Sequence, residues 1–128
     1  MNKNITIASL LGGLAIILGA FGAHTLKNKL APEALHSFET AVRYQIYHML
    51  FVMFINLSQD LSNSVKNRIS QLIFIGIFFF SGSIFAIYLL GVPAKAIWFI
   101  TPLGGLCLVM AWFITAFYFS KKLLKRNR

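Results

Sequence analysis

The sequence predicts an all-α integral membrane protein, a four-helix transmembrane bundle, and three features of its composition support this fold class. Of the 128 residues, 58% are hydrophobic and 12% are charged, and the mean hydropathy is +0.74. Soluble domains carry about 25% charged residues, so this chain cannot cover a globular surface with polar groups. Its hydrophobicity also excludes intrinsic disorder. The single cysteine excludes an internal disulfide framework.

Four stretches of the chain are candidates for membrane-spanning helices, each of which needs about 20 mostly apolar residues. The first stretch has no charged residue from Ile5 to Ala23, and the third and fourth are equally apolar. The second stretch is apolar only from Ile46 to Leu57, so its helix must begin earlier to cross the membrane. We therefore expect a single domain with helices over about 5–24, 32–58, 69–90 and 101–120.

Residues at the expected helix ends support these limits. Pro32 followed by Glu33 marks the start of the second helix, because proline suits the first turn and an acid suits its positive end. Thr101 and Pro102 give the same kind of signal for the fourth helix. The polar segment 57–67 predicts the turn between the second and third helices.

Lysine and arginine are distributed unevenly between the two predicted sides of the membrane. One side holds Lys3, Lys66, Arg68, Lys121, Lys122, Lys125, Arg126 and Arg128, and the other holds Lys27, Lys29, Arg43 and Lys95. The positive-inside rule then places both termini in the cytoplasm. Segment 121–128 becomes a basic cytoplasmic tail, for which we expect contact with anionic lipid and no nucleic-acid partner.

The N-terminal helix has an alternative interpretation as a signal peptide. Lys3, the apolar run and the segment Ala20-Phe21-Gly22 resemble the three regions of a cleavable leader. Cleavage would leave three spans and an outward-facing basic tail. We therefore expect this helix to be retained, in a multi-pass protein of the cell membrane.

Small residues form a narrow stripe along the first helix, at Ala8, Gly12, Ala15, Gly19 and Gly22. Small side chains let helices approach closely in lipid. The stripe predicts packing within this chain's own bundle or, alternatively, between the copies of a homo-oligomer. The fourth helix offers Gly104, Gly105, Ala111 and Thr115 for the same purpose.

The second helix is unusual because polar residues lie along one face of it. Glu39, Thr40, Arg43, Tyr44, Tyr47 and His48 fall within an arc of about 180°. Counted from Ser58 at about 1.5 Å per residue, His48 lies about 15 Å deep and Arg43 about 22 Å deep. Intramembrane ionisable groups usually face a bundle interior or a wet cavity.

Polar residues of the first and third helices reach a similar depth. His24 ends the first helix near the outer surface, and Ser81 and Ser83 lie at about the level of Tyr44. We therefore predict one polar cluster in the outer half of the membrane, formed by His24, Glu39, Arg43, Tyr44, Tyr47, His48, Ser81 and Ser83.

This polar cluster has three interpretations. Paired charges and hydrogen bonds could simply hold the helices together, in which case Arg43→Ala would destabilise the protein. The second interpretation is a non-enzymatic module that binds membrane lipid or a partner. The third is a small oligomeric channel or transporter, with an ion or proton path through Glu39, Arg43 and His48.

Catalytic and metal chemistry have little support in the sequence. No nucleophile–base pair with an orienting third group can be placed, so we expect no enzyme and no cofactor. A metal would need three or four ligands, and only His24, His48 and the distant Cys107 are available. A haem between His24 and His48 is unfavourable because the two histidines lie at different depths.

Four segments of the chain carry a family resemblance. They are 19–24 (GAFGAH), 38–48 (FETAVRYQIYH), 81–83 (SGS) and 101–105 (TPLGG). Together they resemble the domain-of-unknown-function 423 family, also called uncharacterised protein family 0382, to which transmembrane protein 256 is related. The resemblance implies a multi-pass cell-membrane protein with an uncleaved first helix, and it implies no activity.

Overall fold

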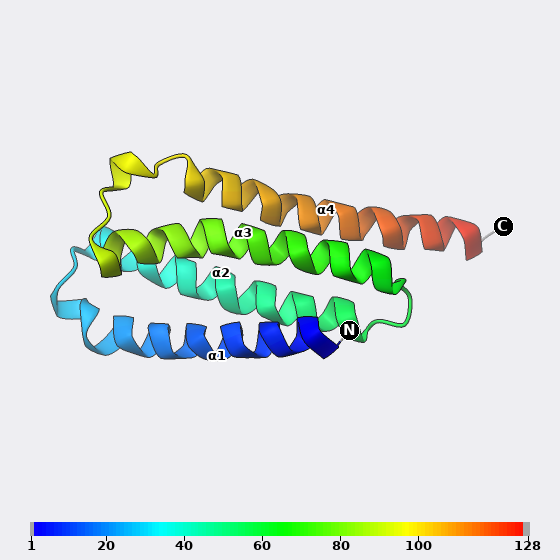
Figure 1. Cartoon of the computed structure of the whole chain (residues 1–128), viewed down its shortest axis with the longest axis horizontal. Coiled ribbons are helices and arrows are strands. Elements are labelled where there is room, and N and C mark those ends of the chain that lie inside the picture. Colours follow the sequence, from blue (N-terminus) through cyan, green and yellow to red (C-terminus); the bar gives the residue numbers. More distant parts are fainter. Residues whose placement is uncertain (1, 127–128) are drawn as a thin grey trace.

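The structure, a computed structural model, describes residues 2–126, which fold into four long helices joined by short connections (Figure 1). The helices are α1 (Asn2–His24), α2 (Pro32–Leu57), α3 (Asn63–Leu90) and α4 (Ile100–Arg126). Two 3-10 turns, η1 (Leu26–Asn28) and η2 (Ala94–Ala96), lie in the first and third connections. The described residues contain no β-strand, and the all-α prediction is confirmed.

The four helices lie side by side in chain order, each antiparallel to the one before it (Figure 1). α1 packs against α2, α2 against α3, and α3 against α4. In the described part of the chain, every extensive contact between long helices therefore joins sequence neighbours. This row differs from a closed four-helix bundle, in which all four helices surround one core.

Helices α3 and α4 are both longer than the sequence predicts. α3 begins at Asn63 instead of residue 69, because the Ser62 side chain caps it and accepts a hydrogen bond from the Val65 backbone nitrogen at 3.4 Å. α4 continues to Arg126, because lysine, leucine and arginine favour helix and basic residues suit its C-terminal end. Most of the predicted tail is therefore helical, and Arg128 lies outside the described residues.

Three of the helices are long and apolar enough to cross a membrane, over Lys3–Asn28, Asn63–Leu90 and Ile100–Arg126. Large apolar side chains on their outer faces are exposed, as a lipid-facing surface requires; Leu10, Phe78 and Phe113 are examples. α2 is not among these three helices, since its first third is polar. It is nevertheless 26 residues long, which corresponds to about 39 Å.

The small-residue stripe of α1 packs against α2 of the same chain. Ala8 and Ala15 are fully buried. A Cβ atom added to Gly19 would lie 3.2 Å from Val42 Cγ1, and one added to Gly22 would lie 2.9 Å from the Phe38 ring. The stripe is thus occupied within one chain, where it lets the two helices approach closely.

An even closer approach joins α4 to α3. A Cβ atom added to Gly104 would meet the backbone nitrogen of Phe80 and would lie 2.7 Å from the Gly76 carbonyl oxygen. Ala111 and Thr115, on the same face of α4, are buried. The small residues of α4 therefore also pack within the chain.

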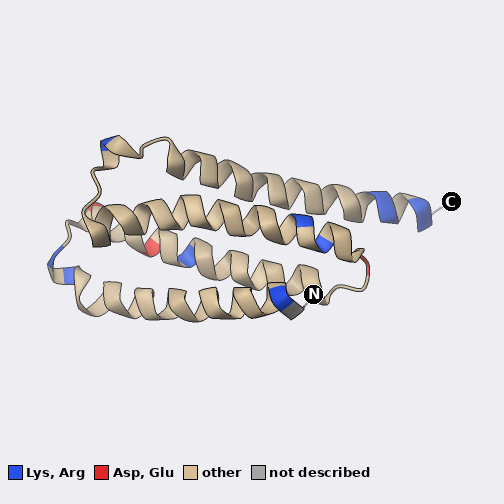
Figure 2. Ribbon diagram, in the orientation of Figure 1, with Lys and Arg blue, Asp and Glu red and all other residues tan. Residues whose placement is uncertain are grey.

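Charged residues gather at the two ends of the helices and leave an uncharged band between them (Figure 2). One end carries Lys27, Lys29 and Lys95, and the other carries Lys3, Lys66, Arg68 and the basic end of α4. Glu39 and Arg43 are exceptions to this gathering, because they follow Pro32, where α2 begins, by seven and eleven residues.

An amide network centred on the buried Asn56 joins three helices near the basic end. Asn4 Nδ2 donates to Asn56 Oδ1 at 3.1 Å and to Asn67 Oδ1 at 2.8 Å. Asn56 Nδ2 in turn donates to Ser70 Oγ at 2.8 Å and to the Val52 carbonyl at 2.8 Å. The Asn56 side chain therefore joins α2 to α1 through Asn4 and to α3 through Ser70, and its second N–H bonds within α2.

The ammonium group of Lys66 lies beside this network instead of in water. Lys66 is buried, and its Nζ donates to the Asn56 backbone carbonyl at 3.1 Å. That carbonyl belongs to the last turn of α2, where the helix dipole attracts a positive charge. Lys66 thereby stabilises the end of α2.

Candidate functional site

The structure divides the eight residues of the predicted polar cluster among four locations. Tyr44, Tyr47 and His48 line a groove, Glu39 and Arg43 lie on the outside of α2, and Ser81 and Ser83 join helices. His24 is exposed at the end of α1 and forms no hydrogen bond or ion pair with the described residues. The eight residues thus share one half of the molecule without forming one contiguous cluster.

The groove lies between α2 and α4, beside the connecting helix α3, and has a volume of about 460 Å³. It is lined by Tyr44, Tyr47, His48, Gly105, Leu108, Val109 and Trp112, and we call it the α2–α4 groove. Most of these side chains are apolar, and Gly105 leaves space where a larger residue would fill the groove. Ligand sites commonly combine such an apolar lining with a few polar groups.

His48 is held by hydrogen bonds on both ring nitrogens. Trp112 Nε1 donates to His48 Nε2 at 3.2 Å, and His48 Nδ1 lies 2.7 Å from the Tyr44 carbonyl oxygen. An indole N–H can only donate and a carbonyl can only accept. These partners together select the neutral tautomer that carries its proton on Nδ1.

Stacked rings give the groove rigid walls. Tyr44 stacks on Phe80 of α3 with ring centroids 4.9 Å apart, and Trp112 stacks on Phe51 with centroids 4.1 Å apart. Such pairs stabilise beyond the apolar area that they bury. The rings of Tyr44 and Trp112 are therefore fixed, although both face the groove.

The two tyrosine hydroxyl groups at the groove are the unpaired polar groups of this site. Neither the Tyr44 nor the Tyr47 hydroxyl forms a hydrogen bond with any described residue, and Tyr47 is 56% exposed. In lipid, such a group gains from a hydrogen-bond partner. Both hydroxyl groups are available to a molecule in the groove.

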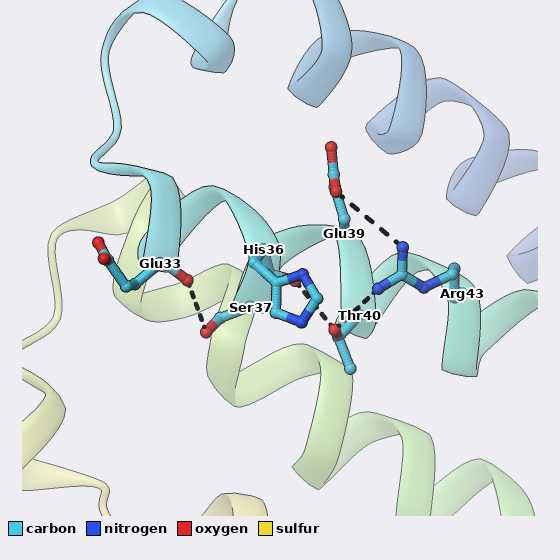
Figure 3. A network of polar contacts seen from close by, with 6 residues as sticks. All are labelled: Glu33, His36, Ser37, Glu39, Thr40 and Arg43. Carbon is cyan, nitrogen blue, oxygen red and sulfur yellow. Dashed lines mark hydrogen bonds and ion pairs between the residues drawn. The ribbon is translucent and has the colours of Figure 1, made fainter.

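Glu39 and Arg43 lie on the outside of α2 and form a local network with its first turns (Figure 3). Arg43 Nη2 donates to Thr40 Oγ1 at 3.1 Å, and Arg43 Nη1 lies 4.0 Å from Glu39 Oε2. The side chains of Arg43 and Glu39 are 45% and 46% exposed. Both side chains therefore point away from the helix contacts, because the buried face of α2 is occupied by apolar side chains such as Phe38 and Val42.

The same network continues toward the start of α2 through hydroxyl groups bonded to their own helix. Thr40 Oγ1 donates to the His36 carbonyl at 2.9 Å, and Ser37 Oγ donates to the Glu33 carbonyl at 3.1 Å (Figure 3). These bonds satisfy the hydroxyl groups without reaching another helix. The network therefore leaves the outer surface of α2 polar and accessible.

Ser81 and Ser83 join α3 to its two neighbours. Ser81 Oγ donates to the Ala41 carbonyl of α2 at 2.7 Å, and Ser83 Oγ lies 2.5 Å from Thr101 Oγ1 of α4. Both serines are buried. Their geometry is that of hydrogen bonds between membrane helices, and neither lines the α2–α4 groove.

Metal chemistry finds no support in the described part of the chain, where no three His, Cys, Asp or Glu side chains converge. Cys107 is a free, partly buried thiol on α4.

Sequence reasoning did not identify Trp112 as the partner of His48. A signal was present, because an indole N–H in the middle of an apolar helix needs an acceptor. The sequence does not give the register between α2 and α4. It therefore does not show that Trp112 lies beside His48, since residues 64 positions apart are brought together only by packing.

Comparison with known proteins identifies the family that this chain resembles. The family described as protein of unknown function (DUF423) matches residues 18–105. A UPF0382 membrane protein of Staphylococcus saprophyticus is 37% identical over 88% of this chain and 92% of its own length. A UPF0382 membrane protein of Haemophilus influenzae is 34% identical over 91% of this chain and 92% of its own length.

A third relative, a UPF0382 membrane protein of Bacillus subtilis, is 37% identical over 77% of this chain and 80% of its own length. No solved structure matches the chain. The family match covers more than half of the chain, and the relatives align over most of their lengths. The chain therefore belongs to the DUF423 family of UPF0382 membrane proteins.

Proposed function

We propose that this protein is a multi-pass protein of the cell membrane in which all four helices cross the bilayer. α2 lies between α1 and α3, and its length of about 39 Å exceeds the hydrocarbon thickness of about 30 Å. Arg43 follows Pro32 by about 17 Å along the helix, so its long side chain can reach the outer headgroups. The excess of lysine and arginine at the opposite end supports cytoplasmic termini.

Within this topology, we propose a non-enzymatic function, the binding of a membrane lipid in the α2–α4 groove. The observation that carries the proposal is the pair of unpaired hydroxyl groups, on Tyr44 and Tyr47, beside an apolar groove of about 460 Å³. An acyl chain fits against Gly105 and Val109, and ester or headgroup oxygens can accept from the two hydroxyl groups. Arg43, one turn away and half exposed, lies where the charged part of a headgroup would be.

The proposal is tested by filling the groove. A Cβ atom on Gly105 would lie 3.7 Å from the Phe80 ring, an ordinary contact, so Gly105→Leu extends into the groove without a forced clash. Gly13→Leu is the matched control, because nothing lies within 4 Å of a Cβ atom there. Each variant is reconstituted with a phospholipid that carries a photoreactive group in its acyl chain.

After illumination, cross-links are mapped by peptide mass spectrometry. In the parent and in Gly13→Leu we expect labelling of the groove residues of α2 and α4 above that of the outer face of α1. In Gly105→Leu the groove labelling falls by about tenfold if the site is lost. Equal groove labelling in Gly105→Leu and the parent would overturn the proposal.

A further inference from the structure

A second groove lies between the beginning of α3 and the end of α4, at the basic end of the molecule. Its volume is about 310 Å³, and it is lined by Val65, Arg68, Ile69, Ile114, Phe117 and Tyr118. We propose that this groove, the α3–α4 groove, binds the phosphate and one acyl chain of an anionic phospholipid. The α2–α4 groove shares none of these residues, so this inference does not depend on the proposed function.

Two hydrogen-bond donors at the α3–α4 groove have no partner among the described residues. The Arg68 guanidinium group is exposed and forms no ion pair or hydrogen bond there, and the Tyr118 hydroxyl group is also unpaired. Guanidinium groups bind phosphate oxygens through two parallel hydrogen bonds. Arg68 of α3 and Tyr118 of α4 can therefore both donate hydrogen bonds to a phosphate group in the groove.

A second cation lies beside the same groove. The Lys121 ammonium group lies over the Phe117 ring, 4.6 Å from the ring centroid, and Phe117 lines the groove. Cation–π contact fixes the direction of this side chain. Lys121 thus adds positive charge beside the groove that Arg68 also lines.

No carboxylate neutralises these cations. The sequence has three acidic residues, and Asp60 is the one at this end of the molecule. Its carboxylate pairs with Lys122, which does not line the α3–α4 groove. The charge at the groove is therefore unbalanced within the described chain and complements an anionic ligand.

The apolar part of the groove indicates that this anion belongs to a lipid. Ile69, Ile114 and Phe117 form an apolar wall of the groove beside the two donors. A free phosphate would use only the donors and would leave this apolar wall exposed. An anionic phospholipid satisfies both parts, with its phosphate at Arg68 and an acyl chain along Ile114.

The test measures lipid retention by the full-length protein with native mass spectrometry in a mild detergent. The probes are phosphatidylglycerol and phosphatidylcholine with identical acyl chains, titrated separately. The variant is Arg68→Gln, which removes the positive charge and the two parallel N–H donors of the guanidinium group but leaves the buried contacts. Lys125→Gln is the matched control, because it removes one charge from the same end without touching the groove.

We expect the parent to retain phosphatidylglycerol over phosphatidylcholine and Arg68→Gln to bind phosphatidylglycerol about tenfold more weakly. Lys125→Gln should change binding by less than about twofold. Tyr118→Phe, which removes one oxygen, should weaken binding by a smaller factor than Arg68→Gln.

Three outcomes would overturn the inference. Equal losses in Arg68→Gln and Lys125→Gln would show diffuse attraction to a basic surface instead of a site. Equal retention of the two lipids would show that the headgroup is not recognised. Displacement of phosphatidylglycerol by millimolar inorganic phosphate would assign the site to a free anion.

Discussion

Trp112 of α4 donates its indole hydrogen to Nε2 of His48 at 3.2 Å, and this bond connects two helices that are not neighbours in the row. Both residues line the α2–α4 groove. The bond therefore fixes the distance between the two walls of the groove as well as the tautomer of His48.

Replacing Trp112 with phenylalanine tests this bond while keeping an aromatic ring against Phe51. The His48 Nε2 atom would lose its donor in apolar surroundings, and we expect the free energy of unfolding to fall by about 1–3 kcal/mol. Thermal unfolding in detergent measures the change. Trp98→Phe is the control, since Trp98 is exposed and its indole has no hydrogen bond with the described residues. Equal melting temperatures for the two variants would contradict the predicted role of the bond.

Gly104→Ala tests the close approach of α4 to α3. The added Cβ atom would meet backbone atoms of Phe80 and Gly76, which cannot rotate away as a side chain can. We expect α4 to be pushed outward and stability to fall by about 1–3 kcal/mol. Gly13→Ala adds the same methyl group in open space and should melt like the parent. A stable Gly104→Ala protein would show that the two helices are farther apart than described.

Arg43→Ala is expected to have little effect on folding. Arg43 Nη1 lies 4.0 Å from Glu39 Oε2, and both side chains are half exposed. Loss of this ion pair should therefore lower the free energy of unfolding by less than about 1 kcal/mol. Asn56→Ala provides the contrast, because it removes a fully buried amide with three hydrogen-bond partners and should cost about 1–3 kcal/mol. The two variants are compared by chemical unfolding in detergent. A larger loss of unfolding free energy in Arg43→Ala than in Asn56→Ala would show that Arg43 lies in the interior of the protein.

Proton transport is expected to be absent. Both ring nitrogens of His48 are engaged, and Glu39 and Arg43 lie outside the helix contacts, so these residues do not line a continuous path within one chain. Liposomes that contain the protein and a pH-sensitive dye should acidify no faster than empty liposomes. Flux that disappears in His48→Ala would contradict lipid binding as the function and would favour an oligomeric channel.

The four helices could be predicted from hydropathy and helix-end residues, because membrane helices have strong apolar signals. Pro32 begins α2 as its position suggests. The start of α3 could not be placed from the sequence, because the polar residues of segment 63–68 resemble a loop. They are helical because Ser62 caps the helix and Lys66 turns inward to the end of α2.

The candidate site could be predicted only in part, and the reason is the register between helices. Depth along the membrane follows from counting residues, and helical spacing predicts one face for Tyr44, Tyr47 and His48, all of which line the α2–α4 groove. Counting does not show which face of α2 meets α4. The exposure of Arg43, the pairing of Ser83 with Thr101 and the role of Trp112 all depend on that choice.

The row arrangement of the helices has a consequence for biogenesis. Since each long helix packs mainly on the one made just before it, the chain has low contact order and each helix can meet its partner soon after it is synthesised. The α1–α2 hairpin can form before α4 has been synthesised. Trp112 is present only after α4 has been synthesised, and its hydrogen bond to His48 then joins α4 to α2. The groove is therefore the last part of the fold to be completed.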